Sequence, residues 1–147
     1  MPAIREANVT WEGDLMSGKG TINNVTSKAF SSLPVTWASR TEAPEGRTSP
    51  EELIAAAHAS CFSMAFSAGL ARAGKPAQRL QVSAKVTFDR VEAGWRVISS
   101  ALTVRGKVAG MDAAAFKQAA EAAKDGCPIS QALKGNVALT VEAVLEK

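Results

Sequence analysis

Two cysteines, Cys61 and Cys127, are the side chains of this 147-residue sequence best suited to covalent chemistry. A cysteine reacts as its thiolate, and two thiols that meet can be oxidised to a disulfide. Permanent structural disulfides are rare in reducing compartments, where paired cysteines more often do redox work. Cys61 alone also fits the ordinary role of a small apolar core residue. The second cysteine shifts the interpretation toward redox chemistry.

Cys127 lies between Gly126 and Pro128, at the expected start of a helix. The unpaired backbone N–H groups and the dipole of a helix N-terminus favour a negative charge, and therefore a thiolate. An incidental capping position is the alternative. The position therefore favours a thiolate at Cys127.

Arg40 and Glu51 are the polar residues that could tune such a thiol. A guanidinium near a cysteine lowers the pKa of its thiol and can donate to a peroxide oxygen with its planar fork, which a carboxylate such as Glu51 can hold in place. The alternatives are a solvated loop arginine, with Arg47 equally basic nearby, and a carboxylate that interacts only with the helix dipole. Glu51 and Cys61 are ten residues apart, about 15 Å along one helix. Joint action therefore needs a bridging group or a second chain.

His58 lies three residues before Cys61, on the same side of the expected helix. A Cys–His pair would support hydrolase or acyl-transfer chemistry. We rank this second, because side chains three apart on a helix point in nearly parallel directions and no orienting partner for the second ring nitrogen is evident. A histidine satisfied at a helix or subunit contact is favoured.

The composition excludes several other classes of function. Two cysteines and one histidine cannot supply the usual four ligands of a zinc site, so neither a metal nor a cofactor is expected. The net charge is +3, but no two basic residues are adjacent, which disfavours a nucleic-acid surface. The N-terminus lacks a secretory pattern and no apolar run reaches the roughly 20 residues of a membrane span. We expect one cytoplasmic domain over residues 1–147, with no membrane or nucleic-acid partner.

A long helix over residues 50–73 should carry Cys61. Ser49 is a good N-cap, Pro50 suits the first helical position, and Glu52 completes a predicted capping box. Gly74 ends the helix. Apolar side chains cover most of its circumference, and a chain of this size has few elements to bury them. A second subunit is the expected source of the missing surface.

The remaining pattern predicts strands and helices without regular alternation, which indicates an α+β fold. Residues 27–49 are expected to be irregular, which is long for a loop in a compact domain. Turn residues 92–94 join two of the strands. The predicted strands are residues 4–11, 18–26, 79–91, 95–108 and 136–145, and the further helices are residues 112–125 and a short one between Cys127-Pro128 and Gly135.

Four segments resemble the osmotically inducible protein C family. TSPEELIAAAHASCFSMAFS at residues 48–67 is similar to its signature helix, and GCPISQAL at residues 126–133 is similar to its second cysteine motif. VTWEGDLMSGKGTI near the start and the segment R-T-x-x-P-E-G from Arg40 are similar to its osmotically inducible branch. The resemblance covers essentially the whole chain.

The resemblance implies an intertwined homodimer with antiparallel sheets around long central helices and active sites at the subunit interface. It implies reduction of organic hydroperoxides, and more weakly of hydrogen peroxide. Cys61 matches the peroxidatic cysteine, Cys127 the resolving cysteine, and Glu51 and Arg40 the two polar residues of the site. The implied reductant is a dithiol, a lipoyl-bearing protein rather than thioredoxin. A thiol sensor without turnover and a Cys61–His58 hydrolase are the alternative functions.

Overall fold

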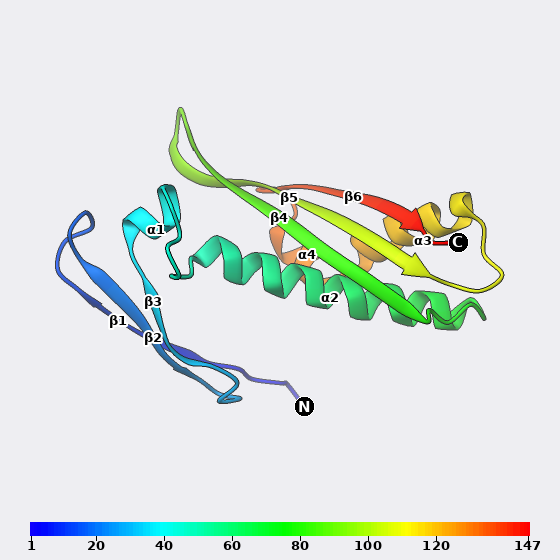
Figure 1. Cartoon of the computed structure of the whole chain (residues 1–147), viewed down its shortest axis with the longest axis horizontal. Coiled ribbons are helices and arrows are strands. Elements are labelled where there is room, and N and C mark those ends of the chain that lie inside the picture. Colours follow the sequence, from blue (N-terminus) through cyan, green and yellow to red (C-terminus); the bar gives the residue numbers. More distant parts are fainter. The chain divides into compact units, whose positions relative to one another are not determined.

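The computed structural model describes residues 1–147, and the chain forms two compact units, Met1–Leu53 and Ile54–Lys147. Each unit contains its own three-stranded sheet, and Figure 1 labels the elements along the chain. Strands and helices do not alternate regularly, so the predicted α+β class is confirmed. The helix that carries Cys61 begins in the first unit and continues through the second.

The first unit contains an antiparallel sheet in the order β1-β2-β3. Its strands are β1 (Ala7–Glu12), β2 (Lys19–Val25) and β3 (Ser31–Val35). The predicted hairpin of the first two strands is confirmed, with ends that differ by a few residues. In its turn, the Asp14 carboxylate accepts hydrogen bonds from the Ser17 backbone N–H and hydroxyl at 2.8 and 2.9 Å. Gly13, at φ 90°, supplies the left-handed conformation of the turn.

The prediction that residues 27–49 are irregular is wrong in part, because they contain β3 and the short helix α1 (Trp37–Thr41). Pro34 can occur in β3 because this strand lies at the edge of its sheet, where a missing N–H is tolerated. A capping box starts α1: the Ser39 N–H donates to the Thr36 hydroxyl oxygen, and the Thr36 N–H donates to the Ser39 hydroxyl oxygen, both at 3.0 Å. These caps position Arg40 one residue further along.

The long helix α2 spans Pro50–Arg72, close to its predicted bounds. Its N-cap is confirmed by the Glu52 N–H, which donates to the Ser49 hydroxyl at 3.1 Å. The reciprocal bond of the predicted capping box is not formed, because the Glu52 carboxylate accepts instead from the Thr48 hydroxyl at 3.0 Å. After the helix, Gly74 takes φ 73°, as expected of a glycine at a helix end.

The second unit contains the sheet β4-β5-β6 with three helices. β4 (Arg79–Val91) and β5 (Gly94–Lys107) form the predicted hairpin, and α3 (Ala113–Gly126), α4 (Pro128–Leu133) and β6 (Ala138–Leu145) follow. β6 runs parallel to β5, so the implied all-antiparallel arrangement is wrong for this pair. The helices α3 and α4 return the chain to the end where β5 starts, and a crossover of this kind makes the next strand parallel.

The core of the second unit forms where α2 and α3 meet one face of the sheet. His58, Phe62, Phe66 and Leu70 recur every fourth residue of α2, so they form one fully buried stripe. On β5 the inward side chains alternate, with Ser100, Leu102 and Val104 all buried. The Phe66 and Phe116 rings are 5.1 Å apart. The two polar side chains His58 and Ser100 therefore lie at one end of an otherwise apolar contact between α2 and β5.

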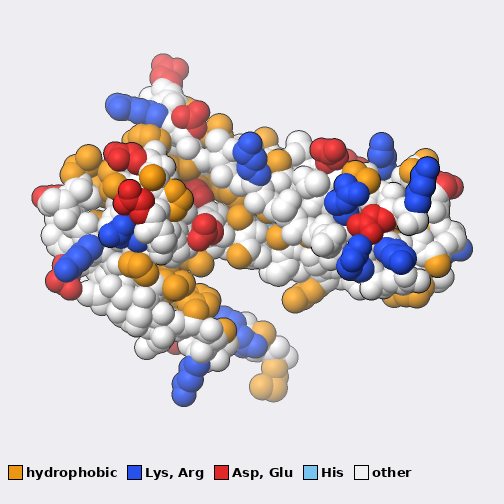
Figure 2. Space-filling view, in the orientation of Figure 1, with side chains coloured by type: hydrophobic (Ala, Val, Ile, Leu, Met, Phe, Trp, Pro, Cys, Tyr) orange, Lys and Arg blue, Asp and Glu red, His pale blue; other side chains and the backbone are white.

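Charged side chains cover part of the exposed surface. Figure 2 shows Lys and Arg side chains gathered around acidic ones toward one end of the second unit. In the second unit, the Arg79 guanidinium pairs with the Glu146 carboxylate at 2.7 Å, and Arg105 approaches the same carboxylate at 3.8 Å. Exposed pairs of this kind contribute little stability each, about 0.2–1 kcal/mol. The functional residues therefore have to be sought among the buried polar groups.

Candidate active site

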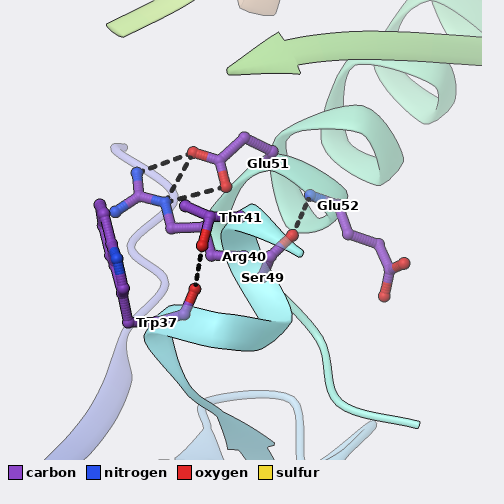
Figure 3. Close-up of polar contacts among 6 residues, drawn as sticks. All are labelled: Trp37, Arg40, Thr41, Ser49, Glu51 and Glu52. Carbon is purple, nitrogen blue, oxygen red and sulfur yellow. Dashed lines mark hydrogen bonds and ion pairs between the residues drawn. The ribbon is translucent and has the colours of Figure 1, made fainter. Parts of the chain in front are cut away.

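Arg40 and Glu51 form a partly buried ion pair in the first unit. The Arg40 Nε lies 3.1 Å from both carboxylate oxygens, and its Nη2 donates to Oε1 at 2.7 Å (Figure 3). The guanidinium also lies 5.9 Å from the centre of the Trp37 ring. Glu51 is only 7% exposed, so this two-point contact fixes the plane and the position of the guanidinium.

Local structure explains why Arg40 rather than Arg47 reaches Glu51. α1 holds Arg40 in its last turn, and the Ser39 hydroxyl binds the backbone carbonyls of Thr36 and Thr48 at 3.0 and 3.3 Å. This bond ties α1 to the residues just before α2, whose first turn contains Glu51. Arg47 is exposed and approaches only Glu45, at 3.8 Å. The structure therefore brings together the two polar residues that the sequence singled out.

The two cysteines meet in the second unit. Cys61 is half-buried on α2 and packs against the core cluster that contains the fully buried Cys127. Cys127 caps two helices at once, because it follows the end of α3 and precedes Pro128, the first residue of α4. Both thiols are free, and each shifts the pKa of the other. Residues 66 positions apart in the sequence are thus arranged as a dithiol pair.

The pair is electrostatically unequal. Burial raises the pKa of the Cys61 thiol; the Ile129 amide opposes this effect and Cys127 adds to it. Burial also acts to raise the pKa of Cys127, but the Ser130 amide, the Cys61 side chain and the Ser130 hydroxyl together lower it. The Cys127 side chain makes no N-cap hydrogen bond to a backbone N–H of α4, so the backbone donors stabilise its thiolate through their dipoles. Within the second unit alone, the negative charge is favoured on Cys127.

His58 is fully buried and both of its ring nitrogens are occupied. Nδ1 lies 2.6 Å from the Ser100 hydroxyl oxygen, and Nε2 lies 2.8 Å from the Ser130 hydroxyl oxygen. Burial lowers the pKa of this imidazole, which keeps it neutral. With both nitrogens bonded to serines, His58 has no nitrogen left to act as a base for Cys61. The favoured expectation of a satisfied buried histidine is confirmed.

Ser100 and Ser130 were not predicted as site residues. Ser130 is the third residue of α4, and in a capped helix the N–H of that position faces the N-cap side chain. The sequence could therefore have indicated that Ser130 lies close to Cys127. Ser100 gives no such signal, since it lies 42 residues from His58. No group of three or more His, Cys, Asp and Glu side chains is arranged to hold a metal ion.

Sequence comparison relates the chain to a peroxiredoxin and to an organic hydroperoxide resistance protein. Peroxiredoxin OsmC of Escherichia coli strain K12 is 41% identical over 139 residues, which cover 95% of this chain and 96% of the relative. The organic hydroperoxide resistance protein OhrA of Bacillus subtilis strain 168 is 31% identical over 100 residues, or 67% of this chain and 68% of the relative.

Structural comparison identifies the same fold. The crystal structure of the organic hydroperoxide resistance protein OhrB of Bacillus subtilis superposes with a TM-score of 0.69 at 22% identity, and covers 94% of this chain and 97% of that one. At this identity the likeness establishes the fold alone. The family described as OsmC-like protein matches residues 43–142, which include both cysteines. Together with the identity to Peroxiredoxin OsmC along nearly the whole chain, this match means that the chain belongs to the OsmC family.

Proposed function

We propose that this chain is a thiol-dependent peroxidase that reduces organic hydroperoxides to alcohols, with Cys61 as the attacking cysteine and Cys127 as the resolving cysteine. The names of its relatives, Peroxiredoxin OsmC and organic hydroperoxide resistance protein, support the activity. The observation that carries the assignment of residues is the packing of Cys61 against the core cluster that contains Cys127, where each thiol shifts the pKa of the other. Cys61 is the half-buried member of the pair, so it is the one that a substrate can reach.

The reaction proceeds in two steps at sulfur. The Cys61 thiolate attacks the distal oxygen of ROOH, the O–O bond breaks, and the alkoxide leaves as the alcohol after it takes up a proton. The oxygen that remains on Cys61 makes it a sulfenic acid. The Cys127 thiolate then attacks that sulfur, a disulfide forms, and hydroxide leaves as water. An external dithiol reduces the disulfide and completes the cycle.

The Arg40–Glu51 pair supplies the positive charge that this chemistry needs. Burial raises the pKa of Cys61, so a nearby cation is required to keep it as a thiolate. We propose that the Arg40 guanidinium acts on Cys61 and on the peroxide oxygens, and that Glu51 orients it. The ion pair belongs to one compact unit and the thiols to the other. The Arg40 that acts on a given Cys61 comes either from the same chain or from a second copy of it.

Two alternatives are less favoured. A Cys61–His58 hydrolase needs an imidazole nitrogen directed at the thiol, but both nitrogens bind serine hydroxyls. A thiol sensor would form the disulfide with an oxidant and then fail to turn over with any dithiol. The relatives named as peroxiredoxin and hydroperoxide resistance proteins favour turnover.

The reductant gives a direct test of the proposed activity. We propose a lipoyl-bearing protein as the dithiol donor, and a cytoplasmic location, where free thiols are maintained. With cumene hydroperoxide as substrate, we expect steady-state turnover when dihydrolipoamide is the reductant. Turnover with a thioredoxin system is expected to be at least about tenfold slower, because the rate of thiol–disulfide exchange depends on access to the buried disulfide. Peroxide consumption measures both. Disulfide formation without turnover with dihydrolipoamide, dithiothreitol or thioredoxin would favour the sensor.

We further propose that the protein is a homodimer. α2 is long and apolar enough to cross a membrane by length and composition, yet in its most apolar 18-residue window only 22% of residues are buried. Its exposed side carries small residues at helical spacing together with Met64, which is 72% exposed. Small side chains allow two helices to approach closely, so a second copy of the chain is a suitable partner for this surface. The polar residues Ser60 and Ser63 on the same helix disfavour lipid as that partner.

Light scattering tests the dimer. At micromolar concentration the native protein is expected to show twice the 15.3 kDa mass of one chain. A Met64→Glu substitution places a charge on the exposed side of α2 and is expected to weaken association by at least about tenfold, since burying an unpaired charge costs several kcal/mol. The control is Met16→Glu, a similarly exposed methionine in a turn of the first unit. A monomer mass for the native chain would contradict the proposal.

A further inference from the structure

A chain of three buried side chains leads from the sheet to the resolving cysteine. Ser100 on β5, His58 on α2 and Ser130 on α4 are 0, 0 and 2% exposed, and their side chains are linked by contacts of 2.6 and 2.8 Å. Ser130 is the third residue of α4, whose N-cap is Cys127, and its amide and hydroxyl both lower the pKa of the Cys127 thiol. The hydrogen-bonded side chains therefore link three elements distant in sequence and end at Ser130, three residues after Cys127.

The direction of the hydrogen bonds decides what this chain can do. A neutral imidazole has one N–H donor and one acceptor nitrogen, and each serine has one hydroxyl proton. If Nε2 carries the proton, it donates to Ser130, and the Ser130 hydroxyl proton is left to donate to Cys127. If Nδ1 carries it, the Ser130 hydroxyl must donate to Nε2 and has no proton for the sulfur. Only the first arrangement stabilises a thiolate.

The first arrangement is the more favourable one when Cys127 is ionised. A hydrogen bond to an ionised acceptor is roughly twice as strong as one between neutral groups. Ser100 can donate its own proton to Nδ1, so all three buried groups keep their partners, in agreement with the absence of unsatisfied buried side-chain atoms. Apart from Cys61, no titratable side chain is among the groups that act on Cys127.

We propose that His58 is a positioning residue for Cys127, which directs the Ser130 hydroxyl proton at the Cys127 sulfur and so holds this thiol deprotonated for the resolving step. The proposal rests on the proposed role of Cys127. It assigns the one histidine of the chain to resolution, the second chemical step, and not to attack on the peroxide. In that step the Cys127 thiolate displaces hydroxide from the Cys61 sulfenic acid, and the proton that Cys127 has lost to solvent balances the hydroxide as water.

The tautomer provides the first test, and it does not depend on peroxidase activity. Because the chain has one histidine, nitrogen NMR of the 15N-histidine-labelled, reduced protein reports on His58 alone. The Nε2–H tautomer is expected from neutral to alkaline pH. The Nδ1–H tautomer would overturn the proposal.

The acidity of Cys127 provides the second test. In a Cys61→Ser background, thiolate absorbance titrates Cys127 alone, and adding Ser130→Ala is expected to reduce the acid dissociation constant of the thiol about tenfold, through loss of one charge-assisted hydrogen bond. Ser100→Ala is the matched control. It removes an equally buried hydroxyl from the same imidazole but leaves the Nε2–H to Ser130 contact, so its effect is expected to stay below about threefold. Equal effects, or none in Ser130→Ala, would overturn the proposal.

Kinetics separate this proposal from the assignment of the cysteines. In the otherwise native chain, Ser130→Ala is expected to slow disulfide formation several-fold and to leave sulfenic acid formation unchanged, so that Cys61 is overoxidised at lower peroxide concentrations. His58→Leu should behave in the same way if it folds. If the native protein forms no Cys61–Cys127 disulfide, the proposed function fails, while the tautomer and the titration still decide the role of His58. A Ser130→Ala protein that resolves at the native rate would overturn the proposal.

Discussion

Replacement of Cys61 by serine is expected to reduce hydroperoxide turnover on the order of 10³-fold or more, to the level of the uncatalysed reaction. A serine hydroxyl is not ionised near neutral pH and is a poor nucleophile toward peroxide oxygen, so the first step is lost. The size of the side chain hardly changes, and Cys61 is only half-buried, so folding should be retained. Consumption of tert-butyl hydroperoxide with saturating dihydrolipoamide measures the effect.

Cys127→Ser is the matched control, because it removes the other thiol of the same pair. It is expected to leave one rapid turnover per chain, which ends in a Cys61 sulfenic acid that can be trapped or overoxidised. Loss of the first turnover in Cys127→Ser together with undiminished activity in Cys61→Ser would exchange the roles of the two cysteines. That outcome needs a direct test, because the groups that surround Cys127 in the second unit favour the negative charge on its thiol.

Replacement of Arg40 by alanine is expected to reduce kcat/KM for organic hydroperoxides about 10²–10³-fold, the usual loss for one preorganised electrostatic group in a reaction that develops charge. Without the guanidinium, the thiolate form of Cys61 becomes rarer and the departing alkoxide loses a donor. The pH at which activity reaches half its maximum should therefore rise. Rates with cumene hydroperoxide over a range of pH measure both changes.

The effect of Arg40→Ala on folding has to be separated from its effect on chemistry. The substitution leaves the Glu51 carboxylate buried and unpaired, which costs about 1–3 kcal/mol of unfolding free energy. The double variant Arg40→Ala, Glu51→Gln removes that buried charge and should recover stability but not activity. Arg47→Ala alters an exposed arginine and should leave activity within about twofold, as surface changes generally do. Equal losses in Arg40→Ala and Arg47→Ala would contradict a specific role for Arg40.

Local sequence signals predicted those elements that contain their own start and stop residues. Ser49 and Pro50 indicated the start of α2, Asp112 that of α3, and Gly94 the β4–β5 turn. The pair Thr36 and Ser39 could have indicated α1, but the prolines on either side of it favoured an irregular segment. β3 gave no clear strand pattern because it is a short edge strand with a proline.

Contacts between distant residues could not be read from local patterns. The spacing of His58 and Cys61 suggested a catalytic pair, and the actual partners of His58 lie 42 and 72 residues away. The parallel pairing of β6 with β5 depends in the same way on where two helices return the chain. The association of Arg40 with Glu51 was suggested by chemistry, and the tie between Ser39 and Thr48 is what makes it possible.

The burial of His58 has a consequence for how the enzyme can be studied. Histidine is the only side chain whose ordinary pKa lies between pH 5 and 8, and ionisation of surface histidines often obscures pH–rate profiles in that range. Here the sole histidine is enclosed, and because burial lowers its pKa below the ordinary 6.5, it is neutral at higher pH. The side-chain ionisations seen in pH–rate profiles just above pH 6.5 are then those of the two cysteines, which titrate as a pair. The protein thus offers an unusually clean background for measuring how two cysteines share one proton.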